Sequence, residues 1–306
     1  MEYEKYHFII NPTSGGGSAG KIWGQTRNYV ESQLGKFSFE FTASKGHGIE
    51  LAKRASEKGI ERLVAIGGDG SISEIITGVM QSGNRDIGIS ILNLGTGGDF
   101  CRTLGVSGDL KIALKQLTSG KTIHADIGIL NYTDNDGNNS IRNFINIAGC
   151  GMAGEVVKSI NQSKKRFGSF SYYISSVKQL LSYKNKAVKI FLDNAPPISH
   201  RIVTIAIANG KYFGGGMQIA PEAKNDDGIF HITVIEDWNL FKKIFLSANL
   251  YNGKILKTSG VFSYTAKKVR IEADEDMAAL IDCDGEDIGS LPMEARVVPS
   301  AVKFIV

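Results

Sequence analysis

A short apolar run ends in three glycines around one carboxylate in the stretch Val64-Ala65-Ile66-Gly67-Gly68-Asp69-Gly70-Ser71-Ile72-Ser73-Glu74. The run before the glycines has the length and composition of a buried β-strand. After the glycines, Ile72, Ile75, Ile76 and Val79 recur at the spacing of one helix face. The sequence therefore predicts a strand, a glycine turn and a helix in direct succession.

The turn between this strand and helix has the properties of a phosphate-binding site. It lacks side chains where backbone N–H groups and a helix N-terminus would face outward, which is what a polyphosphate requires. Asp69 would repel such an anion unless a cation lay between them. The pattern therefore indicates a metal–nucleotide complex rather than bare phosphate.

Strands and helices alternate through the first part of the chain. This order is typical of a parallel sheet with helices on its faces. The predicted strands are 6–11, 37–41, 63–66 and 87–92, and the predicted helices are 22–34, 48–57, the helix after the glycine turn, and 109–117.

After about residue 125 the sequence changes to short β-prone runs separated by turns, which predicts an antiparallel β-sandwich. The predicted fold class is therefore α/β plus all-β, with an α/β domain over 1–125 and a β-sandwich over 126–306. The extreme C-terminus could pack back on the first domain. The predicted strands of the second domain are 142–147, 187–192, 201–208, 229–235, 268–273 and 278–283, with helices near 170–181 and 240–250.

Composition and charge exclude several classes of protein. The charged fraction of 22% and the hydrophobic fraction of 42% are ordinary for a globular chain of 306 residues. The net charge of +4 favours anionic partners, but no Lys/Arg block is dense enough to predict nucleic-acid binding. Three widely spaced cysteines support neither a zinc site nor a disulfide framework. The lack of a signal-peptide pattern or a membrane-spanning run predicts a cytoplasmic protein.

A second glycine cluster fits the dinucleotide-binding pattern. Gly15, Gly17 and Gly20 satisfy GxGxxG after a predicted strand. Glu40 follows about twenty residues on, as such a site requires. The pattern is weak by itself, and it leaves the turn at Asp69 unexplained.

The same cluster also matches most of a P-loop. Gly15, Gly20 and Lys21 stand at the required spacing. Ile22, however, stands where a Ser or Thr must supply a hydroxyl to magnesium. The P-loop interpretation is therefore the weaker of the two.

A third turn of the same kind follows the predicted strand 87–92, in Asn93-Leu94-Gly95-Thr96-Gly97-Gly98-Asp99-Phe100-Cys101-Arg102. It again combines glycines, a hydroxyl and a carboxylate. The carboxyl ends of parallel strands meet at one edge of a sheet, so three glycine turns there would converge on one crevice. We therefore expect one site rather than three separate structural turns.

Five motifs, taken in order, give the chain a family resemblance. Asn11-Pro12-Thr13-Ser14-Gly15 is similar to NPxSG, Thr42 with Gly46-His47 to TxxxGHA, Gly67 to Glu74 to GGDGTxNE, Gly95 to Arg102 to GTxNDxAR, and Asp284-Gly285-Glu286 to DGE. With these motifs the chain resembles the diacylglycerol kinase catalytic family, which includes bacterial lipid kinases and the sphingosine and ceramide kinases. The conjunction is far more specific than any one motif, since Asp-Gly alone would favour an ordinary hairpin turn.

Four positions depart from the family motifs. Ser71 replaces a Thr and keeps its hydroxyl, and Ser73 replaces an Asn. Asn93 stands for the usual Pro, and Gly98 stands for the Asn before the carboxylate of the third turn. These two departures bear on how tightly that turn holds the phosphates and the acceptor.

The resemblance implies a phosphofructokinase-like α/β domain joined to a β-sandwich, with ATP and the acceptor alcohol meeting in the cleft. It implies that Asp69 lies near magnesium, that Asp99 and Asp126 are acidic cleft residues, and that Glu286 is the general base. An alcohol is a poor nucleophile until its proton can leave, so a carboxylate within reach suits this chemistry. The implied catalytic residues are Glu286, Asp69 and Asp99, and the implied ATP-binding residues are Asn11, Pro12, Thr13, Ser14, Gly15, Thr42, Gly68, Asp69, Gly70, Ser71, Ile72, Ser73, Glu74 and Thr96.

Residues 221–229 look like a second metal motif of the bacterial members. The resemblance implies binding by the Asp227 carboxylate and by the backbone oxygens of Lys224 and Ile229, which suits a hard cation. The alternative is a turn capped by Asp226.

The prediction is an ATP- and magnesium-dependent kinase that phosphorylates a hydroxyl of diacylglycerol or a related lipid. We expect it to be peripheral to the membrane, with Lys164-Lys165-Arg166 as a candidate headgroup contact. The edge strands of a β-sandwich could pair between two copies of the chain, so a homodimer is possible. The alternatives are a soluble-acceptor kinase of the NAD kinase or phosphofructokinase type, and a dinucleotide-binding oxidoreductase.

Overall fold

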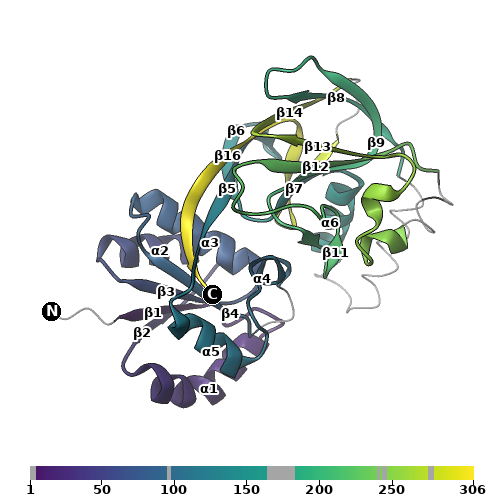
Figure 1. Cartoon of the computed structure of the whole chain (residues 1–306). Coiled ribbons are helices and arrows are strands. Elements are labelled where there is room, and N and C mark those ends of the chain that lie inside the picture. The colour runs from purple at the N-terminus through teal and green to yellow at the C-terminus, as the bar shows by residue number, and fades with distance from the viewer. Residues whose placement is uncertain (1–4, 95–97, 164–182, 240–241, 243–246, 275–278) are drawn as a thin grey trace. The chain divides into compact units, whose positions relative to one another are not determined.

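The structure is a computed structural model that describes residues 5–94, 98–163, 183–239, 242, 247–274 and 279–306. The chain divides into two compact units (Figure 1). The first unit comprises Met1–Ile127 and Pro299–Val306, and the second comprises Gly128–Val298. The last residues of the chain therefore belong to the first unit.

A parallel sheet forms the centre of the first unit. The order of its described strands is β2–β1–β3–β4–β16, and the pairings between neighbours are parallel. The short strands β1, β3 and β4 are almost entirely buried, as apolar strands covered on both faces should be. The predicted parallel sheet is confirmed. The strands are β1 (Tyr6–Ile10), β2 (Ser38–Phe41), β3 (Arg62–Ile66), β4 (Gly88–Leu92) and the end of β16 (Glu286–Ile305).

Helices cover both faces of this sheet, with α2 and α3 on one face and α1 and α5 on the other (Figure 1). Trp23 and Val30 of α1 pack into the same apolar core as Leu114 and Leu117 of α5. The carboxylate of Asp109 accepts from two backbone N–H groups at the start of α5, which fixes where that helix begins. The helices are α1 (Ser18–Leu34), α2 (His47–Glu57), α3 (Asp69–Ser82), α4 (Asp99–Leu104) and α5 (Leu110–Ser119).

Two helices of the first unit differ from the sequence-based expectation. Helix α1 begins at Ser18 rather than near Ile22, directly after three glycines with positive φ. Helix α4 was not predicted, because its six residues are too few to show a helical period. It begins inside the third glycine turn.

Antiparallel strands form a closed circuit of pairings in the second unit. The circuit runs β9–β8–β14–β16–β15–β7 and returns to β9. The predicted antiparallel all-β domain is confirmed, and the long strands β9 and β16 close the sandwich in a barrel-like way. An apolar core that includes Phe144, Ile205 and Phe230 fills it. The further elements are β5 (Thr122–Asp134), β6 (Asn139–Phe144), β7 (Ile147–Gly151), α6 (Met152–Ser163), β8 (Lys186–Leu192), β9 (Ile198–Ala208), β10 (Tyr212–Phe213), β11 (Met217–Gln218), β12 (Phe230–Glu236), η1 (Ser247–Leu250), η2 (Ile255–Lys257), β13 (Val261–Ala266), β14 (Lys268–Ala273) and β15 (Leu280–Cys283).

The predicted single strand 142–147 is wrong, because β6 ends at Phe144 and β7 begins at Ile147. The chain bends between them where three backbone N–H groups turn toward the carboxylate of Asp284. The predicted helix near 170–181 lies outside the described residues. Of the predicted helix over 240–250, the described part contains the short 3₁₀ helix η1.

Within the described ranges, no helix is both long enough and apolar enough to cross a membrane.

Candidate active site

The first glycine turn is held by the side chain of Asn11. Its Oδ1 accepts from the backbone N–H and the hydroxyl of Thr13, at 3.1 and 2.8 Å. Its Nδ2 donates to the Ser71 Oγ, 2.9 Å away in the first turn of α3. Asn11 therefore joins the turn after β1 to the turn after the neighbouring strand β3.

The second glycine turn leaves its backbone accessible. A Cβ on Gly67 would lie 2.4 Å from the Ser71 Oγ, so that position has room only for hydrogen. A Cβ on Gly70 would meet no heavy atom within 4 Å, so the space beside Gly70 is open. The side chains of Ile72 and Ser73 are buried, and either residue would have to contact a ligand through its backbone.

Glu74 holds the loop that precedes α2. Its Oε1 accepts from the backbone N–H of Gly46 at 2.8 Å, and its Oε2 accepts from that of Gly48 at 3.0 Å. In the same loop, His47 Nδ1 accepts from the backbone N–H of Ala43 at 2.9 Å. The carboxylate of Glu74 thus binds protein backbone and positions the loop that carries Thr42.

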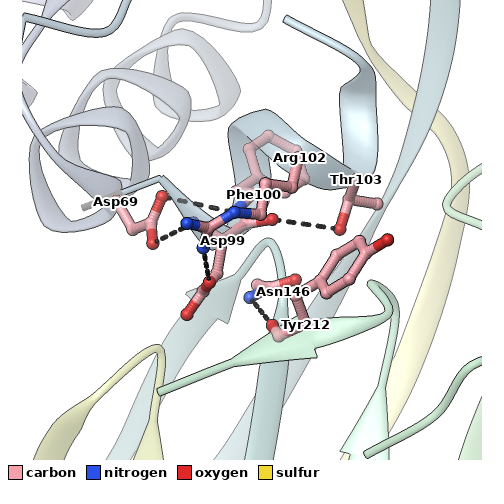
Figure 2. A network of polar contacts seen from close by, with 7 residues as sticks. All are labelled: Asp69, Asp99, Phe100, Arg102, Thr103, Asn146 and Tyr212. Atoms are coloured by element: carbon pink, nitrogen blue, oxygen red, sulfur yellow. Dashed lines mark hydrogen bonds and ion pairs between the residues drawn. The ribbon is translucent and has the colours of Figure 1, made fainter. Parts of the chain in front are cut away.

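Asp69 connects the second turn to the third. Its Oδ2 accepts from the backbone N–H of Asp99 at 3.1 Å, and its Oδ1 accepts from that of Phe100 at 3.4 Å (Figure 2). An Arg102 guanidinium nitrogen lies 2.6 Å from the Asp99 Oδ1, and the Thr103 hydroxyl donates to the Asp99 backbone oxygen at 3.3 Å (Figure 2). Ser71, Glu74 and Asp69 thereby each hold one neighbouring loop.

Two carboxylates lie together at this point. Burial, together with the nearby carboxylate of Asp99, raises the pKa of Asp69, although the two backbone N–H groups oppose the change. The Arg102 guanidinium offsets part of this repulsion. Among the described residues no third acidic, His or Cys side chain joins the two carboxylates, so a magnesium ion beside them would take its other ligands from the phosphates and water, and the open backbone at Gly70 could receive phosphate oxygens. The residues present therefore fit a magnesium–nucleotide complex.

The departures Asn93 and Gly98 are coupled in space. A Cβ on Gly98 would lie 2.4 Å from the Asn93 Nδ2. Gly98 also has a φ of 141°, which side-chain-bearing residues rarely adopt. The side chain of Asn93 thus occupies space that a larger residue 98 would need. Thr96, the predicted ATP-binding residue of this turn, lies outside the described residues.

Asp126 has a structural partner in the first unit. Its side chain is 1% exposed, and its Oδ1 accepts from the backbone N–H of Ser300 at 2.8 Å. It thus ties β5 to the returning end of the chain.

The Asp-Gly-Glu motif is a tight hairpin between β15 and β16. Asp284 and Gly285 have φ values of 48° and 79°, which suit a two-residue hairpin turn. The Asp284 carboxylate accepts from the backbone N–H groups of Ile145, Asn146 and Ile147 at 2.9, 3.0 and 3.1 Å. Burial raises its pKa to about 6, although these three N–H groups oppose the shift. Asp284 therefore fixes the bend between β6 and β7.

Glu286 pairs with Arg142, a residue in none of the sequence motifs. The Glu286 Oε2 lies 2.9 Å from an Arg142 guanidinium nitrogen on β6. Asn146, also outside these motifs, donates from Nδ2 to the Tyr212 backbone oxygen at 2.6 Å (Figure 2). One arginine or asparagine in a β-prone run carries no local signal of such a partner, because the partners lie far along the chain.

The predicted second metal residues occupy one turn before β12. The Asp227 Oδ2 lies 3.2 Å from the His231 Nε2, and its Oδ1 accepts from the backbone N–H of Ile229 at 3.3 Å. Lys224 is exposed in the same turn. Among the described residues, no three His, Cys, Asp or Glu side chains gather into a metal-binding group. A metal ion at this turn would therefore be held by the Asp227 carboxylate together with backbone oxygens, as the resemblance implies.

The residues of the alternative dinucleotide pattern have structural partners. A Cβ on Gly20 would lie 3.0 Å from the Pro12 backbone oxygen, so close packing accounts for this glycine. The Glu40 carboxylate lies 2.6 Å from an Arg54 guanidinium nitrogen. These contacts explain both residues without a dinucleotide.

Two family matches cover most of the chain. The diacylglycerol kinase catalytic domain matches residues 5–130. The YegS C-terminal NAD kinase beta sandwich-like domain matches residues 146–306. The two matches follow the α/β and all-β parts in order.

Curated relatives match over nearly their full length. The chain is 28% identical over 294 residues to a diacylglycerol kinase of Staphylococcus carnosus, which covers 94% of this chain and 90% of that protein. It is 27% identical over 293 residues to a diacylglycerol kinase of Bacillus subtilis, covering 95% and 92%. It is 29% identical over 264 residues to a probable lipid kinase YegS-like protein of Klebsiella pneumoniae, covering 86% and 83%.

Solved structures share the fold. A diacylglycerol kinase structure from Bacillus anthracis superposes with a TM-score of 0.73 at 21% identity, covering 100% of this chain and 97% of that one. A yeast NADH kinase superposes with a TM-score of 0.50 at 13% identity, covering 99% and 83%. The predicted two-domain fold class is thereby confirmed. The two family matches agree with the linked glycine turns. The chain belongs to the diacylglycerol kinase catalytic domain family that carries a YegS-type C-terminal domain.

Proposed function

We propose that this protein is an ATP- and magnesium-dependent lipid kinase that transfers the γ-phosphate to a hydroxyl of diacylglycerol or a related lipid. One observation carries the proposal. Within the single segment that follows β3, Asp69, Ser71 and Glu74 each hold a different neighbouring loop by hydrogen bonds. This arrangement supports one composite phosphate site built from all the glycine turns.

The chain supplies distinct groups to this chemistry. Bound magnesium–ATP would supply the phosphoryl group and neutralise its charge. Residues of the segments 11–15 and 68–74, with Thr42 and Thr96, would hold the nucleotide, and Asp69 and Asp99 would face the cation. Glu286 would orient the acceptor hydroxyl and accept its proton.

Labelled phosphate transfer tests this proposal. The protein is incubated with γ-labelled ATP, magnesium and diacylglycerol in mixed micelles, and we expect label in the lipid product. Glu286→Gln should lose transfer while it still binds ATP, and Asp69→Asn should weaken magnesium–ATP binding. Glu294→Gln is the matched control, since Glu294 lies on the same strand and pairs with Lys268 at 3.0 Å.

The acceptor decides between this proposal and its alternatives. Label in NAD but in no lipid would replace it with a soluble-acceptor kinase. Stabilisation by NADH and not by ATP in thermal denaturation would favour an oxidoreductase. Undiminished transfer by Glu286→Gln would remove the proposed base.

A lipid acceptor requires contact with a membrane surface. The net charge of +4 would favour anionic lipid. Co-sedimentation with anionic vesicles that weakens at high salt would support this contact, and equal binding to neutral vesicles would contradict its electrostatic basis. Two further proposals are a homodimer and a magnesium ion at the turn of Lys224, Asp227 and Ile229. Light scattering measures the oligomeric state, and a comparison of magnesium binding by the wild type and Asp227→Asn tests the metal site.

A further inference from the structure

The β15–β16 hairpin is attached to β6 and the bend after it by two different contacts. Asp284 accepts from three consecutive backbone N–H groups, Ile145 to Ile147. Glu286, two residues further on, pairs with the side chain of Arg142 at 2.9 Å. The first contact fixes the backbone of the hairpin, and the second fixes the direction of the Glu286 carboxylate.

A second carboxylate, that of Asp284 on the hairpin, also acts on Arg142. Tyr132 on β5 and Cys283 on β15 are further neighbours, but burial raises the pKa of both side chains, so both are neutral at neutral pH. Burial opposes the charge of Arg142, but the carboxylates of Glu286 and Asp284 favour it and keep the pKa of the guanidinium above its usual value. Arg142 is therefore a permanent positive charge facing Glu286 from β6.

We infer that Arg142 is a positioning residue that keeps the Glu286 carboxylate ionised and oriented toward the acceptor hydroxyl. This inference rests on the proposed function, in which Glu286 is the base. A carboxylate has two oxygens and several acceptor positions, so pairing through Oε2 is compatible with a bond from a hydroxyl. Phosphoryl transfer depends mainly on positioning and charge, which an arginine partner supplies.

A merely structural ion pair would behave differently. The two side chains of the pair are only 25% and 27% exposed, so removing Arg142 leaves a partly buried carboxylate without its partner and lowers stability whatever the role of the pair. A positioning role adds a change that a purely structural pair does not, because the ionisation of the proposed base then moves together with the rate. A cation that faces a carboxylate favours its ionised form, so its loss should shift ionisation to higher pH.

The experiment compares Arg142→Met, Arg142→Lys and Arg270→Met in the full chain. Arg270 pairs with Glu272 on β14 and is the matched arginine control. For Arg142→Met we expect kcat to fall by about 10- to 100-fold with little change in the KM for ATP. The acid limb of the pH–activity profile should move up by about one pH unit. Arg142→Lys should bring the acid limb of the pH–activity profile back toward the wild-type position more fully than it restores kcat. Lysine supplies the positive charge but lacks the planar guanidinium that fixes the direction of the carboxylate.

A second readout does not require turnover. The Glu286 carboxyl can be titrated by ¹³C NMR in the wild type and in Arg142→Met, with Glu286→Gln to assign its signal. We expect the midpoint to rise by about one pH unit in Arg142→Met and to stay in place in Arg270→Met. An unchanged midpoint, or an unchanged kcat and acid limb in a variant that still folds, overturns the inference.

The outcomes separate the two claims. If Glu286→Gln abolishes lipid transfer while Arg142→Met behaves as wild type, the kinase proposal stands and the role of Arg142 fails. If Glu286→Gln transfers phosphate normally, the base assignment in the proposed function fails, and the midpoint still decides whether Arg142 controls the ionisation of Glu286.

Discussion

Replacing Glu74 with glutamine tests whether the second glycine turn organises its neighbours. Both carboxylate oxygens of Glu74 accept from backbone N–H groups, at 2.8 and 3.0 Å. Glutamine keeps one acceptor oxygen and places an NH₂ group against the other N–H. The substitution has nearly the same size, so it changes hydrogen bonding and charge without opening a cavity.

The expected loss of stability follows from these contacts. One hydrogen bond to a charged group is lost, which is worth about 1.5–3 kcal/mol. A negative charge is also removed from the start of α2, where it contributes about 0.3–1 kcal/mol. We therefore expect the free energy of unfolding of the first unit to fall by about 2–4 kcal/mol.

Urea unfolding with a tryptophan probe measures this loss. Trp23 is buried in the core of the first unit and Trp238 in the second, so a Trp238→Phe background isolates the first unit. Magnesium–ATP binding is measured by calorimetry on the same variants, and we expect weaker binding because the loop before α2 is released. Glu57→Gln is the matched control, since Glu57 is exposed and its partner Lys53 lies 4.0 Å away.

An unfolding free energy of Glu74→Gln within about 0.5 kcal/mol of the wild type would show that Glu74 does not hold the loop, since a change that small is what we expect for the exposed control Glu57→Gln. Loss of stability with unchanged magnesium–ATP affinity would separate the two claims. The carboxylate would then hold the loop, but the loop would have no part in nucleotide binding.

Three further predictions concern single positions. Asp282 is buried, and its Oδ1 has no hydrogen-bond partner within the described residues; burial, with Asp284 and Asp287 nearby, raises its pKa to about 7. The folded protein holds this proton more tightly than the unfolded chain, so the free energy of unfolding falls as pH rises from about 4 to about 7. Asp282→Asn removes the titrating group, so it should flatten that fall and raise the free energy of unfolding at pH 8 by about 1–3 kcal/mol. Denaturant titrations at pH 5 and pH 8 measure this, and a variant with the wild-type pH dependence would contradict it. Gly70→Ala should leave stability unchanged or raise it by up to about 1 kcal/mol, since its Cβ meets no neighbour, yet weaken magnesium–ATP binding at least about tenfold; equal affinity by calorimetry would remove Gly70 from the nucleotide site. Gly98→Ala should destabilise the protein less in an Asn93→Ala background than in the wild type, with a coupling free energy of about 1 kcal/mol. The Asn93→Ala change removes the 2.4 Å contact between the new Cβ and the Asn93 Nδ2, whereas the strain of the positive φ is present in both backgrounds. Additive changes in unfolding free energy would show that the two departures are independent.

Much of the fold could be predicted from local patterns. The strands over 6–10, 62–66 and 88–92 are apolar runs, and the helices between them have regular apolar spacing, so a single sequence contains their signal. The strand at Lys268–Ala273 was predicted with the same bounds that the structure has. Helix α4 could not be predicted in this way, because its six residues are too few to show a helical period. The bend between β6 and β7 could not be predicted either, because the remote carboxylate of Asp284 holds it.

The candidate site shows the same division. The glycine turns and their carboxylates stand out in the sequence, because few other functions require glycines around an aspartate at the end of a strand. The partners of those carboxylates do not stand out. Nothing local to Arg142 indicates Glu286, and nothing local to Gly46 indicates Glu74, since these pairs are 144 and 28 residues apart.

The sequence by itself determined which residue types follow each strand, and through them the fold class and the family. Those features depend on periodicity, on backbone freedom at glycine and on side-chain chemistry, all of which act between near neighbours in the chain. Only the tertiary structure decided what each carboxylate binds: Asp69 the start of α4, Glu74 the loop before α2, and Asp284 the bend before β7. A hydrogen bond depends on distance and direction in space, and the folded path of the whole chain sets both.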